Sequence, residues 1–205
     1  MQPDFSPSAE RNKQPILEVL QRVLPAQGRA LEIASGTGQH VAWFAQHLPQ
    51  WTWQPTDLQR GALYNIEAYA NAADLGNVQA ALRLDVMQPH WLAEGDTVDL
   101  VLCINMLHIA PWATCAALMQ GAAQVLQPNG LLITYGPYLE DHVPTSESNR
   151  AFDASLRAHD PSHGLRQRED VEAVAQAHGL HLRERVAMPA NNLLLVFARS
   201  TGGTP

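Results

Sequence analysis

Residues 31–40 read LEIASGTGQH, and this stretch decides the fold class. The apolar run predicts a strand, Gly36 and Gly38 predict a tight turn, and a helical pattern begins directly afterwards. Glycines let the backbone turn sharply and approach a ligand without side chains in the way. The amides that open the next helix face whatever lies beyond the strand end. The stretch therefore predicts a site for a nucleotide-like cofactor, without saying which cofactor it is.

Working outward, strands and helices are expected to alternate along the chain. Strands are predicted at 30–34, 51–55, 78–84, 98–104 and 131–135. One helix is predicted to begin at Pro15, before the first strand, and further helices follow the glycine turn, begin at about Gln59 and begin at Pro111. Gly76 is predicted to close the helix from Gln59 in the left-handed conformation. This alternation predicts an α/β fold with a Rossmann-like, doubly wound, mostly parallel sheet of seven strands.

The C-terminal part departs from this alternation. After a helix over about 169–178, capped by Gly179, strands at 180–186 and 193–198 flank the short turn MPANN, which requires an antiparallel pair. We expect this pair to give the sheet one reversed edge. Residues 136–168 are irregular apart from a short helix over 149–158, and so long a connection predicts a lid or substrate-binding segment.

The whole chain of 205 residues fits a single domain, in which residues 1–14 form a polar N-terminal arm. A net charge of −7 and a single lysine argue against nucleic acid as a partner. We see neither a secretory signal nor an apolar run of membrane-spanning length, so we expect no membrane contact and a cytoplasmic location. Cys103 and Cys115 are predicted to be small buried residues, and no histidine or cysteine spacing predicts a metal site.

Polar side chains follow three consecutive predicted strands: Asp57, Asp85 and Asn105. Asp57 lies 19 residues beyond Gly38, the spacing at which an acidic side chain accepts hydrogen bonds from ribose hydroxyls. The alternative is that Asp57 only caps the next helix, where aspartate is common. We favour the ribose role, because this spacing follows a glycine turn at a strand end.

The combination of LEIASGTGQH, TDL, LDV, NMLHI and QPNGLLITYGPY resembles a class I S-adenosylmethionine-dependent methyltransferase over nearly the whole chain. More narrowly, ERNKQPIL and TSESNRAFDASLR resemble the methyltransferase-like 26 group. The resemblance implies S-adenosylmethionine as cofactor and methyl transfer to a small-molecule acceptor. One departure is Ala34, which stands where the family pattern often has a glycine and is acceptable if its φ is negative.

The resemblance also implies roles for individual residues. The turn formed by Ala34, Ser35, Gly36 and Gly38 would pass beneath the methionine part of the cofactor, and Glu32 would orient this turn and the amino group. Asp57 would bind the ribose with Leu58 against the adenine, Asp85 and the Val86 amide would bind the adenine edge, and Asn105 would lie near the methyl group.

Candidates for the acceptor side come from the residues themselves. His108, three residues after Asn105, is the candidate general base, since an imidazole that titrates near pH 7 suits that work; a structural histidine is the alternative. Tyr135 and Tyr138 are expected to line the acceptor pocket or only to pack at the sheet. Arg150 and Asp153 are expected to bind substrate or to form a surface ion pair, and residues 11–13 to form a second lid or a solvated arm.

Two other functions share these features. A nicotinamide-dependent oxidoreductase would use the same glycine turn and Asp57, although Val41 stands where a dinucleotide site wants a third glycine. A non-catalytic module that binds S-adenosylmethionine would keep the cofactor residues without a general base.

Overall fold

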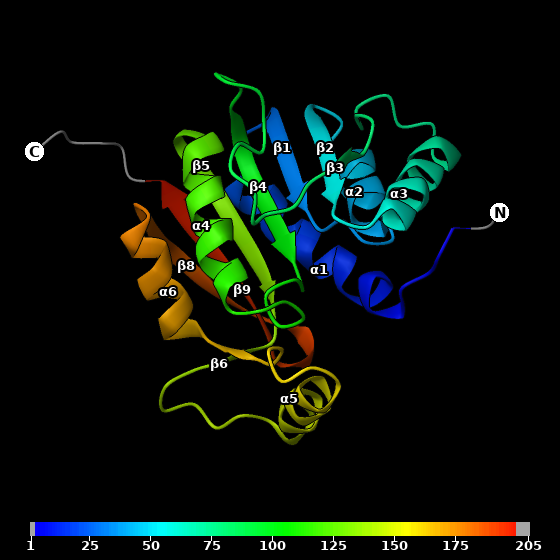
Figure 1. Ribbon diagram of the computed structural model, residues 1–205. Coiled ribbons are helices and arrows are strands. Elements are labelled where there is room, and N and C mark those ends of the chain that lie inside the picture. The colour runs from blue at the N-terminus through cyan, green and yellow to red at the C-terminus, as the bar shows by residue number, and fades with distance from the viewer. Residues whose placement is uncertain (1–2, 200–205) are drawn as a thin grey trace, which may run out of the picture. The chain divides into compact units, whose positions relative to one another are not determined.

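A computed structural model describes residues 3–199, in which seven strands form one sheet with the hydrogen-bonded order β3-β2-β1-β4-β5-β9-β8 (Figure 1). The strands of this sheet are β1 (Gly28–Ile33), β2 (Trp51–Asp57), β3 (Leu82–Arg83), β4 (Val98–Ile104), β5 (Leu126–Gly136), β8 (Leu180–Met188) and β9 (Asn192–Arg199). A second, two-stranded sheet pairs β6 (Tyr138–Leu139) with β7 (Arg166–Gln167).

Within residues 3–199, six α-helices and one short 3₁₀ helix accompany these strands. They are α1 (Pro7–Val23), α2 (Gln39–His47), α3 (Arg60–Ala72), α4 (Ala113–Val125), α5 (Glu147–His159), α6 (Arg168–Ala177) and the 3₁₀ helix η1 (Pro189–Asn191). Helices connect β1 to β2, β2 to β3 and β4 to β5, while the described segment between β3 and β4 holds no helix. The predicted Rossmann-like α/β class is confirmed.

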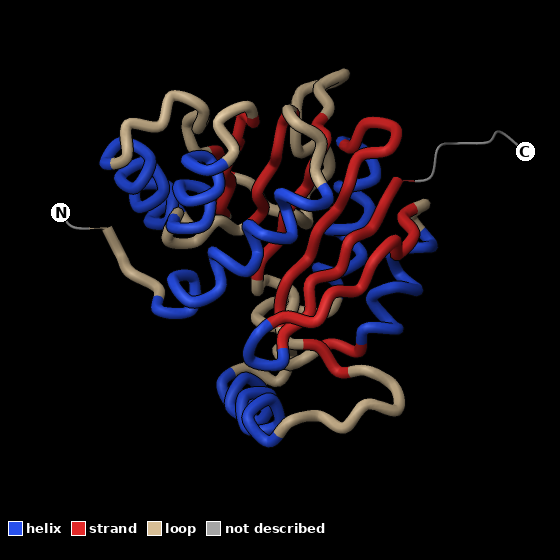
Figure 2. Tube along the Cα trace, turned by 180° about the vertical axis from the view of Figure 1, so that it is seen from behind, coloured by secondary structure: helices blue, strands red, loops and turns tan. Residues whose placement is uncertain are grey.

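The reversed strand lies inside the sheet, which corrects the predicted reversed edge. Strand β1 is parallel to β2 and β4, whereas β9 is antiparallel to both of its neighbours, β5 and β8. The long antiparallel strands are side by side in Figure 2. Burial explains why β9 lies inside the sheet and β8 at its edge. Residues 193–197 of β9 are all buried. In β8, buried or half-buried residues alternate with exposed ones, as in an edge strand with one solvated face.

The described residues gather into two compact units. The first unit is residues 3–85 with 98–103, and the second is residues 86–97 with 104–199. The first unit has a core built around Phe44, Trp51 and Trp53, in which the Trp53 ring contacts the other two in a tilted arrangement. In the second unit, α6 packs on β8, and the apolar residues of β5 and β9 are buried against one another.

The N-terminal segment is helical, contrary to the predicted arm over residues 1–14. Helix α1 begins at Pro7, because Ser6 is its N-cap: the Ser6 Oγ accepts from the Ala9 amide at 3.2 Å. Pro15, predicted as the start, lies inside the helix. Residues 1–2 of the predicted arm lie outside the described residues.

Three local predictions also need correction. Strand β3 has only two residues, with one isolated bridge between Trp53 and Val78 upstream. Gly76 is not the left-handed residue after α3; Asp74 takes that conformation, with a φ of 51°. Strand β5 begins directly after α4, so the Pro128-Asn129-Gly130 turn signal lies within it. Gly179 has the predicted positive φ, at 75°.

Two further expectations concern the cysteines and membrane-spanning helices. Cys103 and Cys115 are buried free cysteines, as predicted. None of the helices described between residues 3 and 199 is long and apolar enough to cross a membrane.

Candidate functional site

The glycine turn after β1 is a succession of left-handed residues in the first unit. Ala34, Gly36 and Gly38 have φ values of 54°, 58° and 84°. The condition under which Ala34 is acceptable, a negative φ, is therefore not met, and its Cβ carries the strain that a glycine there would avoid. The turn needs this conformation because the chain must leave β1 and enter α2 within five residues.

The two glycines of the turn do different work. A Cβ at Gly38 would lie 2.6 Å from the Ile66 Cα on α3, so only glycine lets the turn and that helix approach so closely. A Cβ at Gly36 would meet nothing nearer than the Ala34 carbonyl oxygen, at 4.0 Å. Gly38 therefore serves packing, whereas Gly36 faces open space in which a ligand can lie against the backbone.

Hydrogen bonds attach the turn to the end of β2. The Ser35 amide donates to the Thr56 carbonyl at 2.8 Å, and the Thr56 hydroxyl donates to the Glu32 carbonyl at 2.8 Å. The Gly36 amide donates to Oδ2 of Asp57 at 2.9 Å. Sequence reasoning missed Thr56, although its place beside Asp57 at a strand end was a signal. These bonds hold the predicted cofactor residues of the first unit in one rigid arrangement.

Glu32 is the most unusual side chain of this arrangement. It is 1% exposed, and its Oε2 has no hydrogen-bond partner among the described residues. Burial raises the pKa of the Glu32 carboxyl to about 8, with a smaller contribution of the same sign from the Asp57 charge, against a hydrogen bond from Ser35. A buried, unpartnered carboxyl oxygen is costly unless a donor or cation completes it.

Asp57 has the position predicted for it, with both oxygens engaged. Besides the bond from Gly36, its Oδ1 accepts from the Gln59 amide at 2.8 Å, just before α3. The N-cap of α3 is Gln59, and no side chain caps the helix, so the alternative that Asp57 is the cap is wrong; Asp57 instead binds the Gln59 amide and attaches the glycine turn. Leu58, the next residue, is 44% exposed, which leaves an apolar surface beside this carboxylate. Asp85 is half-buried at the end of the segment after β3.

Helix α1 packs against the start of α2, which sequence reasoning did not predict. The buried Gln39 accepts from the Ser6 amide at 2.6 Å, and the Nε2 of buried His40 lies 2.6 Å from the Asn12 Oδ1. Burial, with the Lys13 charge, lowers the pKa of His40 to about 4. Of the predicted 11–13 lid, Asn12 thus contacts α2, so the segment is a fixed wall of the first unit.

In the second unit, Asn105 and His108 lie over Gly136 of β5. Asn105 has a φ of 61°, and its amide donates to the Tyr135 carbonyl at 2.8 Å. A Cβ at Gly136 would be 3.2 Å from the His108 Nδ1 and 3.5 Å from the Asn105 Oδ1. The structure therefore brings these two predicted residues together, and a glycine in β5 makes room for them.

His108 is held neutral, which corrects the expectation that it titrates near pH 7. It is 5% exposed, and its ring meets that of Phe152 edge-on at 5.7 Å. Burial lowers the pKa of His108 to about 4, and the Arg166 and His163 charges act in the same direction. The imidazole is therefore an uncharged hydrogen-bonding group and a weak base.

Arg166 is a residue that sequence reasoning missed. Its guanidinium donates to the carbonyls of Leu107, Ala110 and Ser162 at 2.6–2.9 Å. Because Leu107 and Ala110 flank His108, Arg166 fixes the segment that carries the histidine. Arg166 lies more than 50 residues after Leu107 and Ala110 in the sequence, so no local pattern pointed to these hydrogen bonds.

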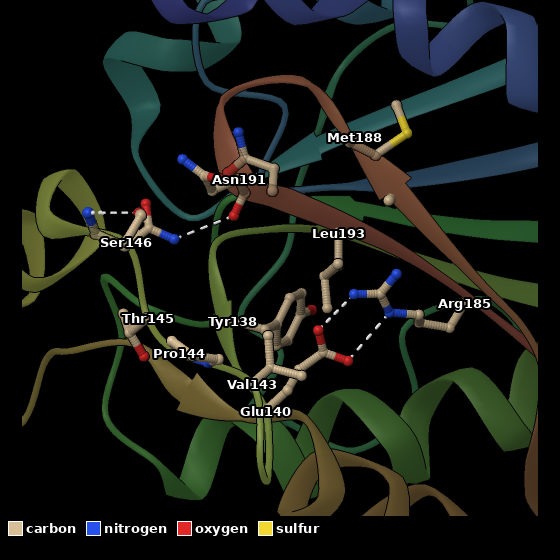
Figure 3. A pocket seen from close by; sticks show the side chains of 13 residues that line it. Tyr138, Glu140, Val143, Pro144, Thr145, Ser146, Arg185, Met188, Asn191 and Leu193 are labelled. Atoms are coloured by element: carbon tan, nitrogen blue, oxygen red, sulfur yellow. Dashed lines mark hydrogen bonds and ion pairs between the residues drawn. The ribbon is translucent and has the colours of Figure 1, made fainter.

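The remaining acceptor-side candidates are buried or form hydrogen bonds within the second unit. Tyr135 and Tyr138 are buried, and the Tyr138 hydroxyl donates to the Thr134 hydroxyl at 2.8 Å. Arg150 is exposed and donates to the Thr145 carbonyl. Asp153 accepts from Arg157 at 2.9 Å and from the Leu165 amide at 2.7 Å, which gives it a structural role. Tyr138 also lines a cavity of about 200 Å³ in the second unit (Figure 3).

Comparison with known structures gives the fold a precedent. The chain is 22% identical to an O-methyltransferase family protein from Burkholderia thailandensis, with a TM-score of 0.79 over 95% of this chain and 58% of that one. It is 15% identical to CalO1, a methyltransferase of calicheamicin biosynthesis in its SAH-bound form, with a TM-score of 0.75 over 94% and 55%. It is 17% identical to an O-methyltransferase family 2 protein from Planctomyces limnophilus in complex with apigenin, with a TM-score of 0.77 over 94% and 60%.

The chain spans somewhat more than half the length of these three proteins, and at such identities the similarity shows the fold alone. A family model described as Protein of unknown function (DUF938) matches residues 3–199. The chain has the fold of the class I S-adenosylmethionine-dependent methyltransferases, and it belongs to the DUF938 family.

Proposed function

We propose that this chain transfers a methyl group from S-adenosylmethionine to a small-molecule acceptor. The observation that carries the proposal is the buried Glu32, whose Oε2 has no hydrogen-bond partner between residues 3 and 199 and which lies at the base of a glycine turn that leaves open space at Gly36. The cationic amino group of the cofactor's methionine part would complete this carboxyl. A pyrophosphate would bring negative charge to the same place, which disfavours the nicotinamide alternative.

The residues of the first unit fit the remainder of the cofactor. Asp57 keeps accepting capacity beyond its two backbone bonds, because each carboxylate oxygen has two lone pairs, and this capacity suits ribose hydroxyls. The exposed Leu58 suits the face of an adenine. The roles of Asp85, Val86 and Asn105 stay predictions, as does the narrower resemblance to the methyltransferase-like 26 group.

When bound, the cofactor supplies an activated methyl group on a sulfonium. The protein then has to orient the acceptor and exclude water. His108 suits this work as a neutral hydrogen-bond acceptor, since its pKa of about 4 makes it a weak base. A carboxylic acid is already ionised at neutral pH and needs no help from such a base, whereas a phenol, with a pKa of about 10, has to lose its proton during transfer.

Several features support a small acceptor over a nucleic acid. The chain carries a net charge of −7 and one lysine, so a phosphate backbone would be repelled. The relative from Planctomyces limnophilus was solved with apigenin, a small molecule. The 136–168 connection, which holds α5, remains the proposed substrate segment.

A methyl-transfer assay tests this function. Purified protein with methyl-labelled S-adenosylmethionine should label at least one member of a panel of phenols, carboxylic acids and amines. His108→Ala should slow that labelling, while Arg183→Ala, an exposed change on β8, should leave it unchanged. Binding of the cofactor without labelling of any acceptor would favour the non-catalytic module. Binding of NADH in place of the cofactor would favour the oxidoreductase.

A further inference from the structure

The second unit holds a cavity that the proposed cofactor residues do not line (Figure 3). Its floor is formed by the buried side chains of Tyr138, Asn149, Met188 and Leu193. Exposed residues form the rim, among them Val143, which is 52% exposed. Three separate segments thus converge on it: the chain after β5, the start of α5, and the turn between β8 and β9. A cavity with buried walls from three segments is a candidate binding site.

The size of this cavity limits its ligand. Its volume is about 200 Å³. An apolar cavity of about 150 Å³ in another protein is large enough for benzene. Cavities for drug-sized ligands begin at about 300 Å³. The cavity therefore matches one ring with one or two small substituents.

The walls favour an aromatic ring. The Tyr138 hydroxyl is bonded to Thr134, so its ring is the part available to a ligand, and a Met188 thioether makes favourable contacts with aromatic rings. Arg185 donates to Glu140 through both Nε, at 3.0 Å, and Nη2, as Figure 3 shows. This paired contact fixes the plane of the guanidinium, and a fixed guanidinium stacks well on an aromatic face.

The charges of the cavity are already balanced. The Glu140 carboxylate is bound by Arg185 and also lies 3.1 Å from the Arg168 Nε. The opposite end presents neutral groups, including the Ser146 hydroxyl and the Asn149 amide, which donates to the Asn191 carbonyl at 3.0 Å. Because the charged groups already satisfy one another, an uncharged ligand that forms hydrogen bonds fits better than an anion.

We infer that this cavity binds a single-ring aromatic compound with an uncharged hydrogen-bonding substituent, of which a phenol is the simplest example. The inference does not depend on methyl transfer, because it concerns only the walls of the second unit. Binding to the protein without cofactor tests it separately from the proposed function.

The experiment is a ¹⁹F NMR titration of the full chain with 4-fluorophenol. We expect saturable broadening of the fluorine signal, competition by unlabelled phenol, and no competition by cyclohexanol at the same concentration. Ala187→Trp, at the exposed rim, should weaken binding by about tenfold or more, because the indole fills the cavity. Arg183→Trp, on the same strand but outside the cavity, is the matched control and should bind as the unaltered chain does.

Three results would overturn the inference. They are no saturable binding of 4-fluorophenol, equal binding by both tryptophan variants with unchanged thermal unfolding, and tighter binding of 4-fluorobenzoate than of 4-fluorophenol. Thermal unfolding of Ala187→Trp shows whether a loss of binding reflects a loss of folding. S-adenosylhomocysteine binding, measured on the same samples, reports on the proposed function independently of these outcomes.

Discussion

The Gly36 amide donates to Oδ2 of Asp57 at 2.9 Å, so the carboxylate predicted to bind ribose also holds the glycine turn in place. The other oxygen of Asp57 binds the Gln59 amide. Asp57 therefore has a structural role at the end of β2, two residues before the N-cap of α3, in addition to the predicted ligand contact. A substitution at Asp57 will therefore disturb the glycine turn as well as ligand binding. For this reason the stability of each Asp57 variant has to be measured beside its affinity.

The two glycines of the turn should respond differently to alanine. Gly36→Ala adds a Cβ in open space and should cost about 1–2 kcal/mol of unfolding free energy, from the left-handed φ alone. Gly38→Ala adds the same strain and a clash with the Ile66 backbone, which should cost a further ~1–3 kcal/mol. Urea unfolding of both variants measures the difference. Equal losses would show that the close approach to α3 is not sterically limiting.

Glu32 should make stability depend on pH. Its pKa is 4.5 in an unfolded chain and about 8 in the folded one, so between these values the folded state holds a proton that the unfolded state has lost. The free energy of unfolding should therefore fall as pH rises through this window, by at most about 1.4 kcal/mol per pH unit. Glu32→Gln removes the titrating group and should flatten that dependence.

Thermal unfolding at several pH values checks this prediction on both proteins. An unchanged pH profile in Glu32→Gln would contradict the raised pKa.

Binding of a cationic amino group should favour the ionised form of the Glu32 carboxyl. Calorimetry with S-adenosylhomocysteine at neutral pH, in buffers of different ionisation enthalpy, should then reveal proton release that Glu32→Gln lacks.

His40 should make the stability of the protein depend on pH in the acidic range. Because its folded pKa of about 4 lies below the unfolded value of 6.5, the unfolded state binds a proton first as pH falls. Stability from this group is full above pH 6.5 and decreases as pH falls from 6.5 to 4. His40→Gln keeps a group that can bond to Asn12 and should lose part of this dependence. Urea unfolding between pH 4 and 6.5 measures this dependence in both proteins. The same change of unfolding free energy with pH in both would refute the prediction.

Arg166 should be a major stabilising residue of the second unit. Arg166→Met removes donors to three backbone carbonyls and should cost about 1–3 kcal/mol of unfolding free energy. Arg183→Met on the exposed face of β8 is the matched control and should change stability by less than about 0.5 kcal/mol. A similar small loss at both positions would mean that water replaces the Arg166 contacts.

The sequence predicted the elements whose evidence is local. The strands β1, β2 and β4 were predicted from short apolar runs, and these runs are mostly buried. The turn after β1 was predicted from its two glycines. The start of α1 was missed, although Ser6 followed by Pro7 is a local cap signal. The two-residue strand β3 was overestimated, because an apolar stretch at a sheet edge need not pair along its whole length.

What the sequence did not predict depends on contacts between distant residues. Gln39 and His40 are buried only because Ser6 and Asn12 pack against them, and a polar pair at a helix start gives no sign of this. The lowered pKa of His108 has the same origin, since it comes from burial and from Arg166. The positive φ of Ala34 reflects a backbone path fixed by the turn, which overrode the residue's own preference.

Calorimetric titration with S-adenosylhomocysteine tests the central claim most directly. We expect the unaltered chain to bind it, Asp57→Ala to bind it more weakly by about 1–3 kcal/mol through lost hydrogen bonds, and Asp57→Asn to fall between them. Asp96→Ala, an exposed change in the second unit, should bind as the unaltered chain does. Absence of binding to the unaltered, folded chain at millimolar ligand, or equal affinity in all four proteins, would contradict the account.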